Sequence, residues 1–293
     1  MIIKNMNMKN IRHLLIISVV SLLFSGTIFS QEKDNSPVYS PWACSMLIDN
    51  QTTVTPEKGV TEMLIHHRFG KISQISDLLG IYAPSNIRLG VNYGITDKIM
   101  VGVGTEKDNK MQELQWKYNF LQQTKSGSMP VAVSYYGNVV IDARNEEVFG
   151  GNYGFSHRLS YFHQLIIGRK FTDAFSFQVA GGYAHFNSVD STKHNDYLGI
   201  SAGARIKVYN EISLMAEYDH SFPITDLIEN HQADFTPKPN LALGVEFGTG
   251  THAFQVFGAQ YKNIINQKNL GYNLNDLTDG GWLLGFNITV RFY

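Results

Sequence analysis

The strongest constraint on the fold is a two-residue alternation at the C-terminal end of the chain, in residues 281–293. Apolar side chains occupy one parity, at Trp282, Leu284, Phe286, Ile288, Val290 and Phe292. The other parity is small or polar, with Leu283 as the exception. Because successive side chains of a β-strand point to opposite faces, this segment is predicted to be a strand with one apolar and one polar face. Its length suits a tilted strand that crosses a bilayer, which needs about 9–11 residues.

The same alternation recurs upstream, most sharply in residues 113–121. There Leu114, Trp116, Tyr118 and Phe120 oppose Glu113, Gln115, Lys117 and Asn119. An aromatic stripe opposite charged residues suits lipid on one side and a polar interior on the other. The predicted strands before the closing one are 60–69, 88–95, 98–105, 113–121, 131–141, 157–171, 175–186, 197–208, 212–220, 241–247 and 252–261. The pattern predicts an all-β fold, an up-and-down antiparallel transmembrane β-barrel of about 12 strands with a range of about 10–14.

The links between these strands alternate in length. Short links are predicted at 96–97, 172–174, 209–210 and 250–251, with a somewhat longer one at 122–129. Long links are predicted at 70–86, 142–156, 187–196, 221–240 and 262–280, and 106–110 is a short exception among them. Outer-membrane barrels have long outer loops and short periplasmic turns, so we expect the C-terminus in the periplasm. A secreted β-sandwich also alternates, but it does not explain tyrosines repeated on the apolar face.

The N-terminal region is predicted to be a secretory signal peptide at residues 1–30. Basic residues precede an apolar run at 14–24, and a small residue stands at the expected cleavage site, which is Ser30 or, as an alternative, Ser25. The run is about half as long as a membrane-spanning helix requires. We therefore expect export to the bacterial outer membrane, with residues 60–293 as the barrel. Residues 31–59 are expected to form a periplasmic extension, a lumen plug or an extra strand, and the sequence does not choose among these.

Several stretches of the chain resemble an uncharacterised family of outer-membrane β-barrel proteins of Bacteroidota. They are residues 47–59, 65–70, 86–97, 101–104, 117–118 and 251–255. The resemblance covers most of the chain after the signal peptide. It implies the barrel fold and the outer membrane as location, and it implies no activity.

The polar parity predicts which charged side chains line the lumen. They are Arg88, Glu113, Lys117, Arg158, Arg205, Lys207, Glu217, Glu246 and Arg291. Bases exceed acids in this set, which leaves two interpretations open. The charges either fill a narrow barrel as a paired network, or they line a weakly anion-preferring passage.

The sequence predicts a non-catalytic outer-membrane barrel that acts as a structural or docking component or as a small-solute passage. We expect no catalytic residue, metal ligand or cofactor. The expected partners are outer-membrane lipid, the barrel-assembly machinery during insertion and an unidentified envelope protein. Nucleic acid is not expected, because the formal net charge is −1 and no basic run is present.

Two alternative functions involve the predicted outer rim. A metal or haem site would use the histidines expected there, which are His66, His67, His157, His185, His194, His220 and His231. A lipid hydrolase would need a nucleophile such as Ser160 close to a base such as His66. Parity argues against the metal or haem site, because several of the histidines share the lipid-side face. Position argues against the hydrolase, because Ser160 is expected below the rim and His66 on a distant strand. His163 has the apolar parity in mid-strand, which predicts a local bulge.

Overall fold

The computed structural model describes residues 34–72, 75–224 and 235–293. The predicted signal peptide at residues 1–30 and the predicted rim residue His231 lie outside the described residues.

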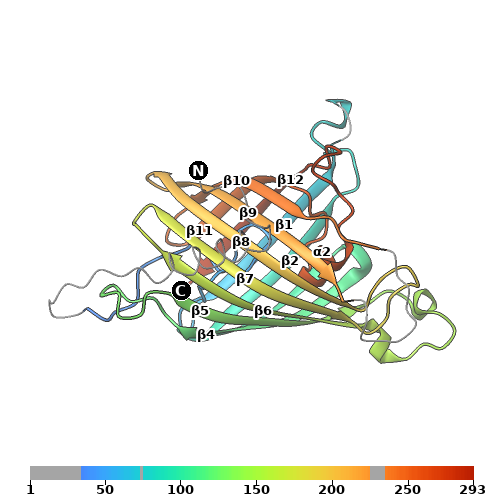
Figure 1. Ribbon diagram of the computed structural model, residues 1–293, viewed down its shortest axis with the longest axis horizontal. Helices are drawn as coiled ribbons and strands as arrows, with labels where there is room; N and C mark the ends of the chain where they lie inside the picture. The colour runs from blue at the N-terminus through green and yellow to red at the C-terminus, as the bar shows by residue number, and fades with distance from the viewer. Residues whose placement is uncertain (1–33, 73–74, 225–234) are drawn as a thin grey trace, which may run out of the picture.

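Twelve antiparallel strands form one closed barrel, in which every strand pairs with its neighbours in the chain and β1 pairs with β12 (Figure 1). The strands are β1 Thr61–Lys71, β2 Asn86–Thr96, β3 Ile99–Glu106, β4 Met111–Leu121, β5 Ala132–Asp142, β6 Leu159–Lys170, β7 Phe175–Phe186, β8 Asp196–Tyr209, β9 Ile212–Pro223, β10 Asn240–Gly248, β11 His252–Ala259 and β12 Leu283–Phe292. The predicted all-β up-and-down barrel and its strand number are confirmed. The sixth strand begins later than predicted, because residues Phe155–Arg158 form a 3-10 turn, η4.

The two ends of the barrel differ in the length of their links (Figure 1). The long links gather at one end, here called the long-loop end, and the shorter links and the C-terminus lie at the other, the short-turn end. The other short elements are η1 Ile75–Asp77, η2 Asp108–Lys110, η3 Glu146–Phe149 and the helix α2 Asn266–Tyr272. No helix in the described ranges is long and apolar enough to cross a membrane.

The outward face of the strands carries an apolar belt. At its centre Val245 pairs with Leu214 on one side and with Val256 on the other, and all three side chains are exposed. The inward face is polar, as Glu217 and Gln255 show beside them. A closed barrel leaves no unpaired strand edge, so backbone polar groups are satisfied within the wall and the apolar belt can face lipid.

His163 keeps the outward parity without the predicted bulge. Strand β6 pairs in unbroken register with β5 and with β7 around this residue, so the bulge prediction is wrong. The imidazole is accommodated by its neighbours instead. Tyr135 Oη lies 2.7 Å from His163 Nδ1, and the ring stacks between Tyr135 and Tyr183.

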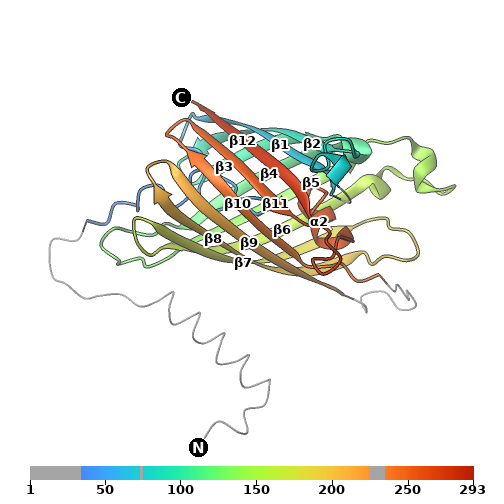
Figure 2. The same cartoon turned by 90° about the horizontal axis from the view of Figure 1, so that it is seen from above.

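Two segments that do not belong to the wall enter the lumen. The N-terminal insert, residues 42–55, and the C-terminal insert, residues 260–275, which includes α2, are both largely buried (Figure 2). Strand β8 makes room for each with an inward glycine. A Cβ on Gly203 would stand 2.7 Å from Leu47 of the first insert, and one on Gly199 would stand 2.3 Å from Leu270 of the second.

The outward belt makes a testable prediction about depth in the membrane. Val245→Arg places a charge at the centre of the belt and should lower the free energy of unfolding in a lipid bilayer by about 2–4 kcal/mol. The matched control, Tyr209→Arg at the short-turn end, should lower it by about 0–1 kcal/mol, because this site is near the interface. Equal losses in the two variants, measured by denaturant titration in vesicles, would show that the belt does not face hydrocarbon.

Candidate functional site

The candidate site is the lumen, where the N-terminal insert folds back on itself as a tight hairpin. Leu47 N donates to Asn50 O at 2.9 Å, and Thr52 N donates to Ser45 O at 2.9 Å. The tip of the hairpin is therefore residues 47–50, and it is buried inside the ring of strands. The sequence left three places open for this region, and the lumen is where the structure puts residues 42–55.

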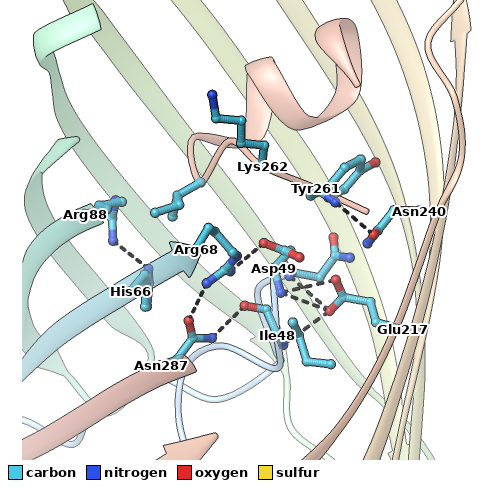
Figure 3. Close-up of polar contacts among 12 residues, drawn as sticks. Ile48, Asp49, His66, Arg68, Arg88, Glu217, Asn240, Tyr261, Lys262 and Asn287 are labelled. Atoms are coloured by element: carbon cyan, nitrogen blue, oxygen red, sulfur yellow. Dashed lines mark hydrogen bonds and ion pairs between the residues drawn. The ribbon is translucent and has the colours of Figure 1, made fainter. Parts of the chain in front are cut away.

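The hairpin tip is bound by one buried carboxylate from the wall, that of Glu217 on β9 (Figure 3). Three successive backbone N–H groups donate to it. The shortest donor distances to its oxygens are 3.3 Å from Ile48, 3.1 Å from Asp49 and 3.1 Å from Asn50. Three backbone donors converge on one carboxyl group, so this contact fixes the tip against one side of the barrel.

The opposite side of the tip is held by Arg68 of β1. Arg68 Nη2 forms an ion pair with Asp49 Oδ1 at 2.7 Å, and its Nη1 donates to Asn287 Oδ1 at 3.0 Å. Asn287 Nδ2 then donates to the carbonyl oxygen of Ile48 at 2.8 Å (Figure 3). Burial raises the pKa of Asp49, and the neighbouring Arg68 guanidinium opposes that shift.

The base of the hairpin is held by charged side chains of β4 and β1. Lys117 Nζ donates to the carbonyl oxygens of Ser45, at 2.8 Å, and of Val54, at 3.0 Å. The hydroxyl of Ser45 donates to the Glu62 carboxylate. Arg291 of β12 also reaches Glu62, at 3.3 Å.

Amide side chains complete the attachment around the wall. Asn50 donates to Asp219 of β9 at 2.5 Å and accepts a hydrogen bond from Gln164 of β6 at 2.9 Å. Gln178 of β7 donates to the carbonyl oxygen of Gln51 at 2.8 Å. The insert is therefore bonded to strands on all sides of the lumen.

The C-terminal insert closes the lumen from the long-loop end. The Glu106 carboxylate accepts hydrogen bonds from the backbone N–H groups of Ile264, at 3.1 Å, and Ile265, at 3.3 Å. Leu270 of α2 packs in an apolar cluster with wall residues that include Phe162. Asn266 Nδ2 reaches the carbonyl oxygen of Asp49 at 3.4 Å, so the two inserts meet inside the barrel.

Open space in the barrel is divided by these contacts. A pocket of about 780 Å³ opens at the short-turn end beside Trp42 and Arg205, and one of about 670 Å³ opens at the long-loop end beside Arg158 and Lys268. Between them, where the inserts meet, lies a cavity of only about 20 Å³. This is room for about one water molecule and not for a solute.

The predicted lumen residues fall into three groups. Arg88 pairs with Glu113 through Nε at 2.9 Å, and Arg205 pairs with Glu246 at 2.6 Å. Lys117, Glu217 and Arg291 hold the N-terminal insert directly or through Glu62, as described above.

The remaining two predicted residues lie at the ends of the barrel. Arg158 belongs to η4, before the start of β6, and lines the long-loop pocket. Lys207 is exposed and lines the short-turn pocket.

The expected excess of bases over acids in the interior is wrong. The described wall and inserts also bury six carboxylates outside the predicted set, and these are Asp49, Glu62, Glu106, Asp142, Asp196 and Asp219. The matching addition among the bases is Arg68. Glu62, Glu106 and Asp219 have the inward parity of their strands, so alternation could have predicted that they are buried. The position of Asp49 depends on how the insert folds and could not be predicted in this way.

The two alternative sites are not assembled in the described part of the chain. Ser160 lies on β6 and His66 on β1, and four strands separate β1 from β6 along the barrel. His66 instead faces Arg88, with 3.5 Å between its Nδ1 and Arg88 Nη1 (Figure 3). Within the described ranges, no group of three or more His, Cys, Asp or Glu side chains is arranged to hold a metal ion.

The fold and the closed lumen define a class, a twelve-stranded β-barrel with an apolar outer belt and two internal inserts. Residues 43–292 match the family model described as a membrane bound beta barrel domain (DUF5777). The chain therefore belongs to this family of membrane-bound β-barrels. No curated protein matches the chain.

Two solved outer-membrane barrels align with the chain at low identity. The COG4313 outer membrane channel from Pseudomonas putida F1 aligns with a TM-score of 0.52 and 11% identity, over 84% of this chain and 100% of the other. The NanC porin aligns with a TM-score of 0.49 and 9% identity, over 80% of this chain and 99% of the other. At 11% identity, the similarity to the Pseudomonas putida channel shows the fold alone.

The Glu217 contact predicts a local effect on the insert. Glu217→Gln replaces one of the two acceptor oxygens with an amide donor, and should lower the free energy of unfolding by about 1–3 kcal/mol. The amides of residues 48–50 should exchange with deuterium at least about tenfold faster than in the wild type. Glu211→Gln, on the exposed turn between β8 and β9, is the matched control and should change neither quantity. Unchanged exchange at 48–50 in Glu217→Gln would show that this carboxylate does not hold the tip.

Proposed function

We propose that this protein is a non-catalytic barrel of the bacterial outer membrane that forms a small-solute passage and holds it closed. The observation that carries the proposal is the N-terminal insert, a separate segment that occupies the lumen. A barrel that served only as a scaffold could be filled by side chains of its own wall, as smaller barrels are. A lumen filled by a separate segment retains a route that opens when the segment moves.

The attachment of the insert supports this proposal. Apart from its chain connection to β1, the insert is held by hydrogen bonds, by the ion pair between Asp49 and Arg68, and by apolar packing of Leu47 and Ile48 against the wall. Each hydrogen bond contributes only about 1 kcal/mol net. Pockets reach inward from both ends and stop at the two inserts, so displacing the inserts would join the pockets into one path.

Location and orientation form part of the proposal. The apolar belt, the membrane-bound family and the predicted signal peptide at residues 1–30 support the outer membrane. We place the long-loop end outside the cell and the short-turn end in the periplasm, as in other outer-membrane barrels. Lipid then surrounds the belt, and the barrel-assembly machinery inserts the chain. The similar Pseudomonas putida barrel is an outer membrane channel, which is consistent with a passage.

A docking role is the second candidate, favoured by one exposed apolar link. The link between β1 and β2, at the long-loop end, carries four apolar side chains that are each at least half exposed. They are Leu78, Leu79, Ile81 and Tyr82. Such a group is a common feature of surfaces that contact another protein. An envelope protein is the partner that this candidate requires.

Planar-bilayer recording tests the passage directly. The full-length protein after signal removal should conduct rarely or not at all. Replacing residues 43–54 and residues 262–274 with Gly/Ser linkers of equal length removes the contacts of both inserts to the wall, including those to Glu217, Arg68 and Glu106, and steady openings should then appear. The control replaces residues 76–82 with a Gly/Ser linker, which leaves the lumen untouched and should remain closed.

Two results would contradict the proposal. Frequent, steady openings of the unmodified protein would show that the lumen is not closed. A double-linker variant that refolds as a heat-resistant barrel, runs as such in detergent electrophoresis and still never conducts would show that the inserts do not close a passage.

A further inference from the structure

The pocket at the long-loop end has the size and construction of a ligand site. It measures about 670 Å³, within the range of about 300–1,000 Å³ that is usual for small-molecule sites. Its walls come from separate parts of the chain, the links that follow β5 and β7 and the C-terminal insert. The insert is thus both a seal for the lumen and the floor of this pocket.

Cationic side chains dominate the lining of the pocket. They are Arg144, Arg158, Lys193, Lys262 and Lys268, and the carboxylates that line it with them are Asp142 and Asp190. Asp142 pairs with Arg144 at 2.6 Å, and Asp190 pairs with Lys193 at 2.7 Å. The pocket therefore keeps a surplus of positive charge after its internal pairs are formed.

Arg158 and Lys268 form no ion pair with a carboxylate within the described ranges. Arg158 donates instead to the carbonyl oxygens of Asp142, at 2.8 Å, and of Arg144, and to the hydroxyl of Tyr153. Lys268 projects from α2 and is half-buried. Burial lowers the pKa of Lys268 to about 8, against the opposing effect of Glu106 and Asp142. An anion in the pocket would restore the stabilisation that this ammonium group lacks.

Aromatic rings lie beside these cations. Lys193 Nζ stands 4.5 Å from the ring centre of Tyr272, and Lys268 Nζ stands 5.5 Å from the same ring. The Arg158 guanidinium lies 4.9 Å from the ring centre of Phe149. Flat apolar rings next to cations suit a ligand that carries an acidic group on a ring of its own.

We propose that the long-loop pocket binds a sugar-sized organic anion, in which a carboxylate or phosphate group pairs with Lys268 and Arg158 while the sugar ring lies against Tyr272 and Phe149. This inference goes beyond the proposed passage, because the pocket is complete in the closed barrel and binding requires no opening. A free acidic sugar and the phosphorylated sugar of a lipid headgroup share this chemistry.

Isothermal titration calorimetry on the full chain after signal removal, in detergent micelles, tests the site. The probes are glucuronate, glucose 6-phosphate, glucose and purified lipopolysaccharide. Glucuronate or glucose 6-phosphate should bind and glucose should not, if the ligand is a free solute. Binding of lipopolysaccharide alone would support the site and assign it to a lipid headgroup, provided that it responds to the variant below.

The decisive variant is Lys268→Gln, which should weaken binding about tenfold or more, because a charge-assisted hydrogen bond is lost. Its melting temperature should not fall, since Lys268 has no ion pair to lose. Lys98→Gln, an exposed lysine at the short-turn end, is the matched control and should bind as the wild type does. Absence of binding by all acidic probes, equal binding of glucose, or full binding by Lys268→Gln would each overturn the proposal.

Discussion

The closed lumen depends on how a buried carboxylate is satisfied. Glu217 lies in the middle of the wall, and three backbone N–H groups of the N-terminal insert donate to it. A carboxyl group without hydrogen-bond partners in such a place would be destabilising, and so would unpaired backbone N–H groups at the hairpin tip. The Glu217 carboxyl group and the backbone N–H groups of the tip therefore satisfy each other's hydrogen bonds. The other contacts of the insert surround this one. Arg68 with Asp49 secures the far side of the tip, and Lys117 secures the base.

The wall of the barrel could be predicted from the sequence and the contents of its lumen could not. Strand β4 alternates between apolar and polar residues, such as Trp116 and Lys117. This period of two can be read from the sequence without knowing which strands pair with β4. Residues 42–55 have no such period. Their position is fixed by bonds to side chains more than a hundred residues away, such as Glu217 and Gln178. The inward glycine Gly203 makes space for Leu47, but this role can be recognised only when the positions of both residues in the structure are known.

The same distinction explains the error about charge. Parity predicted the inward positions of Arg88 and Glu113. It also places Glu62 and Asp219 inward within the predicted strands 60–69 and 212–220, although the predicted lumen set omits them. Asp49 lies in the N-terminal insert, where no alternation predicts the direction of its side chain. As a result the interior is a network of carboxylates satisfied by arginines, amides and backbone N–H groups. The surplus of positive charge lies in the long-loop pocket, where Lys268 of the C-terminal insert provides part of it.

The central claim is that the N-terminal insert fills the lumen, and Cys44 within that insert reports on it directly. It is the single cysteine of the chain, it is buried, and burial raises the pKa of its thiol to about 12. The measurement is the labelling rate of Cys44 by a small water-soluble thiol reagent, on the folded protein in vesicles and on the unfolded chain. The account predicts complete labelling of the unfolded chain and almost none of the folded barrel over the same time. Rapid labelling of the intact barrel would mean that the insert does not occupy the lumen, and the account would be wrong.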